Sequence, residues 1–435
     1  MSTAQVGEKC NCFRQHQAGN AVEEQSVTMF PLKTFHMRRR FDKTAIADPY
    51  AETRREMDAI SLEGVQQGQS VAITASSRGI TDIVPITKAV VDHFTEIGLR
   101  PVIVPAMGSH AGGTAASQEQ LLRDAGLTGD CLNCPIHSSM ETVVLGELDV
   151  GDGISCLVHF DRIAAEADHV FLVNRIKSHT RFAGPIESGL LKMLMIGLGN
   201  AVGASIYHRA VADDRFSAVI RRVAGFIMSK RSVLGGVGIV ENAEGQTATV
   251  RAIAAGNLFD EEEKLLALSK RLMPRLPFDE IDLLFIDRIG KNISGTGFDT
   301  NVVGRKFNDH RAVRGEKPVV RRIAVLGLTP ETHGNATGLG IAEFCLTSLL
   351  KGIDVTATRL NAITADHVSA AMIPLDYETE EEIIAAAWHS LGSPEPSDFR
   401  VLWIQDTQHL EEMVASEALL KNLPSGIEVL GECKR

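Results

Sequence analysis

Lys192 stands in the setting that most suggests chemistry. It interrupts an unusually apolar run, residues 190–196 (LLKMLMI), in a part of the chain rich in glycine. A lysine in such a run is either a surface residue of an amphipathic helix or a desolvated amine. Burial lowers the pKa of a lysine and makes its amine a nucleophile. The residues around Lys192 leave both interpretations open.

Three histidines stand where proton transfer or metal binding would suit them. His110 follows Gly-Ser in a glycine-rich stretch, His179 lies in a polar stretch after an apolar run, and His208 comes sixteen residues after Lys192. Histidine titrates near neutral pH, so two of them could serve as proton acceptors on the two faces of one carbon. His208 could be a metal ligand. Taken alone, His110 and His179 are as readily ordinary residues, and His208 is more readily an ordinary helix-flanking histidine.

Arg78 is a candidate clamp for a carboxylate, because its planar guanidinium binds both carboxylate oxygens. A solvated arginine in a turn is an equally good interpretation.

The cysteines offer one weak metal motif. Cys131 and Cys134, with His137 nearby, have the spacing of zinc ligands, and so do Cys10 and Cys12. A zinc site would need the two pairs to converge, and the C-x2-C pair does not repeat. We therefore favour incidental cysteines in a loop and a tail.

Five apolar runs rich in β-branched residues are predicted strands, and each leads into a loop with polar candidates. The strands are expected at 71–75, 101–106, 169–174, 282–287 and 322–328, and the loops after them carry Arg78, His110, His179, Lys291 and His333. In open α/β sheets, ligands bind beyond the carboxyl ends of the strands. The loops together predict one composite site.

Helical spacing of apolar residues alternates with these strands. We expect helices at 87–97, 117–125, 215–228, 259–272, 338–350, 379–391 and from His409, a hairpin over 235–242 and 247–256, and a last strand at 400–406. Strands that alternate with helices predict an α/β fold of mainly parallel sheets flanked by helices.

Two prolines after a charged helix, Pro274 and Pro277, predict a domain boundary. We expect a poorly ordered tail over 1–27, a catalytic and cofactor-tethering α/β domain over 28–274, and a second α/β domain over 275–435. The second domain would close the interdomain cleft that holds the site, and its last helix could pack back on the first domain.

Composition narrows the class of protein. The 435 residues carry a net charge of −11 with no basic patch interleaved with aromatics, which argues against nucleic acid as a partner. No apolar run reaches the roughly 18 residues of a membrane helix, and the first residues lack an apolar signal core. Seven scattered cysteines fit a reducing compartment, so we expect a cytoplasmic protein.

Common cofactor and nucleophile motifs are missing. The glycines at 197–203 resemble a dinucleotide fingerprint, but a helix-like segment precedes them where a strand is required. The sequence contains no Walker A motif, no Gly-x-Ser-x-Gly elbow and no His-Glu-x-x-His.

At His179, Lys192 and His208 the sequence resembles the nickel-dependent lactate racemase family, and the resemblance runs from about Phe30 to Val414. That family places a catalytic histidine before Ala-Gly, then a tether lysine, then a nickel-binding histidine. Here Ala-Gly at 183–184 follows His179, and the lysine-to-histidine interval is sixteen residues.

The resemblance implies a role for each candidate. Lys192 would carry the nickel-pincer nucleotide, a nicotinic-acid-derived cofactor bound through a thioamide, and His208 would bind its nickel. The loop ending in His110 resembles the Gly-Thr-His loop of the other catalytic histidine, so His110 and His179 would be the acid/base pair. Arg78 would hold the substrate carboxylate, and Lys291 would contact substrate or cofactor from the second domain.

The implied activity is that of an isomerase, a racemase or epimerase of a small-molecule 2-hydroxy acid. Hydride would pass from the α-carbon to the cofactor, give a planar 2-keto acid, and return on the other face.

The chain departs from the lactate enzymes around these residues. Ser178 replaces a proline, Ala75 replaces the aspartate of the Asp-x-Thr-Arg turn, and His110 is followed by Ala-Gly-Gly. Extra residues, among them Gly-Pro-Ile-Glu-Ser-Gly at 184–189, separate His179 from Lys192. These changes bear on the substrate more than on the cofactor, and a sugar acid is a candidate.

Two alternatives stay open. A metal-dependent hydrolase or lyase could use His110, His179 and His208 around a divalent ion, although carboxylates at ligand spacing are missing near them. A non-catalytic cofactor-binding protein, a carrier or sensor, could hold the nucleotide on Lys192 without turnover. Two acid/base histidines beside the tether argue against that alternative.

Overall fold

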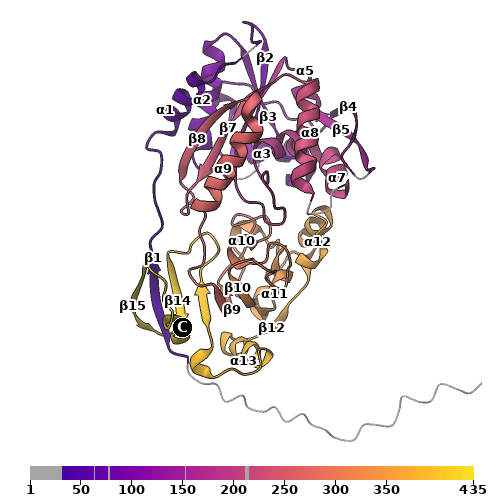
Figure 1. Ribbon diagram of the computed structural model, residues 1–435. Helices are drawn as coiled ribbons and strands as arrows, with labels where there is room; N and C mark the ends of the chain where they lie inside the picture. Colours follow the sequence, from indigo (N-terminus) through magenta and orange to yellow (C-terminus); the bar gives the residue numbers. More distant parts are fainter. Residues whose placement is uncertain (1–31, 63, 77–78, 152, 211–214) are drawn as a thin grey trace, which may run out of the picture. The chain divides into compact units, whose positions relative to one another are not determined.

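The computed structural model describes residues 32–62, 64–76, 79–151, 153–210 and 215–435, with 208–210 described by backbone alone (Figure 1). Residues 32–435 form one compact unit. The expected tail over 1–27 and the candidate Arg78 lie outside the described residues.

The first sheet has five strands in the order β3-β2-β6-β7-β8. They span β3 (Arg100–Pro105), β2 (Ser70–Ala75), β6 (His169–Arg175), β7 (Val233–Glu241) and β8 (Thr247–Ala254). The first four are parallel, and β8 returns antiparallel to β7 as the expected hairpin. Side chains on a strand alternate between its two faces. Ala72 therefore joins the core on one face, whereas Val71 and Ile73 join the core on the other.

Helices cover both faces of this sheet. They are α1 (Pro49–Ala59), α2 (Ile83–Glu96), α3 (Ala115–Asp124), α4 (Gly129–Leu132), α5 (Arg162–Glu166), α8 (Phe216–Lys230) and α9 (Leu258–Leu272). Helix α2 shows why: Ile83, Ile86, Val90 and Phe94 recur at helical spacing and are buried on one side. A hairpin of β4 (Thr142–Asp149) and β5 (Ser155–Asp161), which the sequence analysis did not predict, forms a separate two-stranded sheet.

The second sheet has eight strands in the order β12-β11-β10-β9-β13-β14-β1-β15. They span β12 (Leu375–Tyr377), β11 (Phe344–Leu346), β10 (Val319–Val325), β9 (Glu280–Ile286), β13 (Val401–Ile404), β14 (Glu412–Ser416), β1 (Thr34–Arg39) and β15 (Ile427–Cys433). The first five are parallel and the last three antiparallel. Strand β1, from the start of the described chain, thus completes the sheet built by its last third.

Short helices accompany the second sheet. They are α10 (Thr300–Val303), α11 (Thr347–Leu350), α12 (Val355–Thr364), α13 (Glu380–Ser390) and α14 (Glu417–Leu420). Helix α13 begins with a capping box in which Thr379 and Glu382 exchange side-chain-to-backbone hydrogen bonds.

The predicted fold class, α/β with mainly parallel sheets flanked by helices, is confirmed. Two predicted helices are wrong. Residues 338–350 form a 3-10 turn, strand β11 and the single turn α11, because Cys345 is fully buried where β11 extends the parallel sheet. The helix expected from His409 is strand β14, whose Met413 and Ala415 point into the core beside β13.

Within the described ranges, no single helix is long and apolar enough to cross a membrane. One pair, Leu190–Gly197 and Asn200–Tyr207, passes by length and composition together but bends by 107°. Its apolar side chains belong largely to the core on one face of the first sheet.

Candidate functional site

Lys192 ends the short helix α6 (Leu190–Lys192), which runs directly into a π-helical turn (Met193–Gly197) and then α7 (Asn200–Ala210). Leu190, Leu191 and Leu194 are fully buried, whereas Lys192 is half-buried. The segment therefore presents one polar side chain from an otherwise buried stretch. Such π-turns are rare and frequently mark functional sites.

The ammonium of Lys192 faces an aromatic stack. Its Nζ lies 6.0 Å from the ring centroid of Phe182 and 5.8 Å from that of Phe216. The two rings stack with centroids 3.7 Å apart and planes inclined by 20°. The imidazole of His179 stacks on Phe182 at 4.3 Å. The structure thus brings two predicted site residues, His179 and Lys192, to one aromatic stack that also favours a cation or a planar group.

The loop after β6 holds the His179 ring in a definite orientation. Its Nδ1 accepts hydrogen bonds from the backbone N–H groups of Arg181 and Phe182, both at 3.1 Å. A ring nitrogen that accepts such bonds carries no hydrogen. The neutral ring therefore has its hydrogen on Nε2.

A buried carboxylate, Glu187, anchors the same loop. Its Oε2 accepts from the backbone N–H of His179 at 2.7 Å and from the Ser178 hydroxyl at 3.0 Å. Lys306 lies 2.7 Å from Oε2, and Lys270 lies 2.6 Å from Oε1. Burial opposes ionisation of Glu187, but the Lys306 charge and the hydrogen bonds outweigh it and hold the pKa of this carboxyl below its usual value. Burial lowers the pKa of Lys306, and the Glu187 carboxylate opposes that effect.

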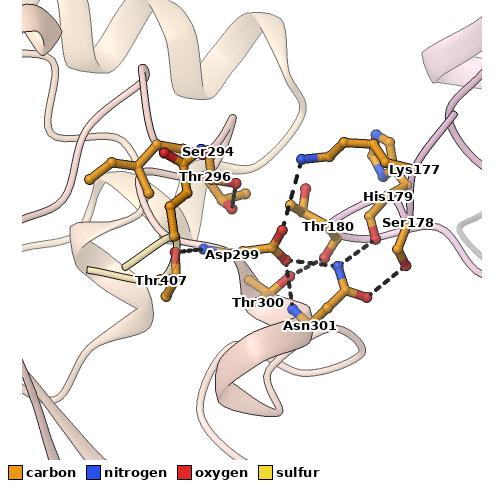
Figure 2. Close-up of polar contacts among 12 residues, drawn as sticks. Lys177, Ser178, His179, Thr180, Ser294, Thr296, Asp299, Thr300, Asn301 and Thr407 are labelled. Atoms are coloured by element: carbon orange, nitrogen blue, oxygen red, sulfur yellow. Dashed lines mark hydrogen bonds and ion pairs between the residues drawn. The ribbon is translucent and has the colours of Figure 1, made fainter. Parts of the chain in front are cut away.

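Residues 299–301, at the start of helix α10, also contact the loop, and Figure 2 shows Asp299, Thr300 and Asn301 beside Ser178, His179 and Thr180. Oδ1 of Asn301 lies 2.9 Å from the Ser178 hydroxyl and shares its single hydrogen with Glu187, and Nδ2 of Asn301 donates to the carbonyl of His179 at 3.1 Å. The Thr300 hydroxyl donates to the carbonyl of Thr180. Asp299 caps the helix, and its carboxylate lies 3.9 Å from the ammonium of Lys177. The loop that carries His179 is therefore held by residues more than 100 positions away.

A second buried carboxylate, Glu262 on α9, holds the start of the Lys192 segment. Its Oε2 accepts from the backbone N–H of Leu191 at 2.9 Å. Burial raises the pKa of Glu262 to about 7, against hydrogen bonds from Leu191 and Leu190 that lower it. A Cβ at Gly189 would lie 2.4 Å from Oε1 of this carboxyl, so a larger residue there would have to displace the Glu262 side chain.

The His110 loop packs against the same segment through its backbone. The N–H of Gly108 donates to the carbonyl of Gly197 at 3.2 Å, and Gln118 donates to the carbonyls of Gly108 and His110. Gly108 has a φ of 58°, and a Cβ there would lie 3.1 Å from the carbonyl oxygen of Ile196. The imidazole of His110 itself is exposed.

The remaining candidates stand as follows. His208 lies on α7, and its side chain, like Arg78, lies outside the described part of the chain. Lys291 donates from Nζ to the carbonyl of Gly295 at 2.6 Å, within its own loop. His333 is exposed in a turn with a φ of 47°.

The cysteine motif has the features of ordinary thiols. Cys134 is buried and its Sγ contacts the carbonyl of Pro101, and burial raises its pKa to about 11. Cys131 is exposed. Among the described residues, no group of three or more His, Cys, Asp or Glu side chains could hold a metal ion.

A cavity of about 850 Å³ opens beside the His179 loop. Arg175, Lys177 and Ser178 line it from the end of β6, and Asp299 and Thr407 line it from loops after strands of the second sheet. Ser178 lines the cavity, but His179 does not. The carboxyl ends of strands from both sheets thus border one cavity, whereas the interdomain cleft itself stays a prediction.

Glu187, Glu262, Asn301 and Lys306 are the site residues that sequence reasoning missed. The one available signal is that Glu187 lies in the extra residues between His179 and Lys192. The partners of Glu187 are Lys270 on α9 and Lys306, and no local sequence pattern connects either of them to it.

Neither a family model nor a curated protein matches the chain. Among solved structures, it is similar to the lactate racemase apoprotein from Thermoanaerobacterium thermosaccharolyticum, with a TM-score of 0.51, 12% identity, and coverage of 87% of this chain and 99% of that one. It is also similar to a Thermotoga maritima protein, with a TM-score of 0.51, 14% identity, and coverage of 84% and 98%. These similarities show the fold: the chain has a lactate racemase-like fold, as the sequence resemblance implied.

Proposed function

We propose that this protein is an isomerase that inverts the α-carbon of a 2-hydroxy acid, with a nickel-pincer nucleotide carried by Lys192. The observation that supports it most is the shared aromatic stack, which holds His179 and the amine of Lys192 together on a lactate racemase-like fold.

The described residues fit a planar cofactor attached to a lysine. The amine of Lys192 is half-buried beside two stacked phenylalanines, and the helix behind it is buried and held by Glu262. When bound, the nucleotide would accept a hydride from the substrate and return it. By the resemblance, His208 would be its nickel ligand.

The residues around Lys192 would bind and orient the substrate. Arg78 would hold the carboxylate, and Lys291 is a further candidate contact. His110 and His179 would lie at the hydroxyl, as the acid/base pair that the resemblance implies. Phe182 and Phe216 would exclude water from the reacting carbon, because both are buried.

The cavity favours a substrate larger than lactate. A volume of about 850 Å³ lies in the range of pockets that hold ligands of many atoms. Lys177 and Thr407 line it together with acidic residues such as Asp299 and Glu241, and such donors and acceptors suit a chain of hydroxyls. We therefore propose a polyhydroxy acid, such as a sugar acid.

An assay of chirality tests this function. Protein produced with nickel and with the enzymes that make the nucleotide is incubated with single stereoisomers of polyhydroxy 2-hydroxy acids and of lactate. We expect the epimer at the α-carbon to accumulate from a polyhydroxy acid faster than from lactate. Inversion of lactate alone would contradict the substrate class, and inversion of none by protein that carries the nucleotide would contradict the activity and support the carrier alternative.

The hydrolase or lyase alternative makes a different prediction. It requires activity with a divalent ion and without the nucleotide, around His110, His179 and His208. Cleavage products instead of an epimer would identify it.

A further inference from the structure

Glu187 is the point where two distant parts of the chain meet the His179 loop. Its side chain has no exposed surface, and it pairs with Lys270 on α9 and with Lys306 after α10. The oxygen that faces Lys306 also accepts the backbone N–H of His179. A charged hydrogen bond of this kind is about twice as strong as a neutral one, and here it acts in a buried place.

The same loop then turns back on the His179 ring. With its backbone N–H held by Glu187 and its carbonyl held by Asn301, His179 is fixed on both sides of its Cα. The chain after it brings the N–H groups of Arg181 and Phe182 to Nδ1. The anchored peptide and the ring orientation belong to one short loop.

We infer that Glu187 is a positioning residue that holds His179 as a neutral hydrogen-bond donor through Nε2–H. A hydrogen on Nδ1 would face two amide hydrogens, so the Nδ1–H tautomer does not fit this loop conformation. A neutral Nε2–H ring can polarise a carbonyl or bind a hydroxyl oxygen.

For catalysis, this inference rests on the proposed function. The Nε2–H of His179 would donate a hydrogen bond to the substrate oxygen. His110, the other member of the proposed acid/base pair, would take the hydroxyl proton as the hydride leaves the α-carbon.

Nitrogen NMR of the full chain without cofactor tests the positioning role. The nitrogen shifts of protonated and unprotonated imidazole nitrogens differ widely, so they report the tautomer directly. Protein labelled at histidine nitrogens is compared with His179→Gln to assign the resonances. We expect the Nε2–H tautomer for the neutral His179 ring in the wild type, and a mixture with the Nδ1–H tautomer in Glu187→Gln.

Glu262→Gln is the matched control. It removes another buried carboxylate on the neighbouring α9 segment, whose described contact is with Leu191, and it should leave the His179 tautomer unchanged. If Glu187→Gln does not fold, Glu187→Gln combined with Lys306→Met removes one cation along with the anion and is expected to give the same mixture.

Two results would overturn the inference: an Nδ1–H tautomer in the wild type, or an unchanged Nε2–H tautomer after loss of Glu187. Because the measurement needs no nucleotide, its outcome is separate from that of the proposed activity. A protein with the expected tautomer that inverts no hydroxy acid would keep the positioning role and lose the proposed function.

Discussion

The ammonium of Lys306 lies 2.7 Å from the carboxylate of Glu187, although 119 positions separate the two residues. Both side chains are buried, at 8% and 0% exposure. Removing one partner of a buried pair leaves the other charge without compensation. Lys270 still neutralises part of that charge, so Lys306→Met should lower the free energy of unfolding by about 3 kcal/mol.

Urea denaturation checks this value. The matched control is Lys264→Met, because Lys264 pairs with Glu261 on the surface of α9. Loss of an exposed pair should change stability by less than about 1 kcal/mol. Equal losses of stability in the two variants would show that the buried pair stabilises the protein no more than the exposed pair does.

The raised pKa of Glu262 should make the stability of the protein depend on pH. Its pKa is about 7 in the folded protein against an ordinary value of 4.5, so the folded state binds more protons between these values. The free energy of unfolding should therefore fall as pH rises through this window, by up to about 3 kcal/mol in total. Glu262→Gln should remove this part of the dependence, whereas exposed Glu263→Gln should keep it. Chemical denaturation at pH 5 and pH 8 measures the difference, and parallel curves for wild type and Glu262→Gln would contradict it.

Gly197 is required by a close backbone approach. A Cβ there would lie 2.6 Å from the carbonyl oxygen of Ala106, at the contact between the His110 loop and the π-helical turn. Gly197→Ala should therefore cost about 1–3 kcal/mol of stability. Gly225 lies in α8 with open space around it, so Gly225→Ala should be neutral or stabilise by up to about 1 kcal/mol. Thermal unfolding of both variants makes the comparison, and a neutral Gly197→Ala would show that the contact is loose.

We expect the hydrogen bonds of Asn301 to keep the His179 loop rigid. Asn301→Ala removes the hydrogen bonds to Ser178 and His179 and should cost about 1–2 kcal/mol. Hydrogen exchange at 177–182 should speed up, while exchange within β6 stays slow. Asn257→Ala is the control, because Asn257 is exposed and its side chain makes no capping hydrogen bond to α9. If exchange at 177–182 is unchanged in Asn301→Ala, α10 does not hold this loop.

The sequence predicted those parts of the fold that rest on local pattern. The short β-branched run at 71–75 indicates a buried strand, and the helical spacing of apolar residues such as Val90 and Phe94 indicates a helix. The helices predicted at 338–350 and from His409 were wrong, because pairing with the neighbouring strands β10 and β13 makes strands of β11 and β14. Strand β1 joins β14 and β15 by pairing that no local pattern contains.

The site residues were likewise predicted only where the local sequence indicates them. Loops after strands were expected to carry His110 and His179, and Lys192 was singled out by its apolar run; the structure places His179 and Lys192 on one aromatic stack. Phe216 could not be anticipated as their neighbour, because it comes from a different helix. The sequence marked Glu187 only as one of the extra residues between His179 and Lys192. Its role depends on ion pairs with Lys270 and Lys306, which are distant in the sequence.

Intact mass spectrometry tests the central claim most directly. Protein is produced with nickel and the enzymes that make the nucleotide, beside a Lys192→Arg variant that keeps the positive charge. We predict a mass increase equal to the nickel-pincer nucleotide in the wild type, located at residue 192 by peptide mapping, and none in Lys192→Arg. An unmodified wild-type chain from cells that modify a known nickel-dependent racemase, or an adduct that persists in Lys192→Arg, would contradict the assignment of Lys192 as the tether.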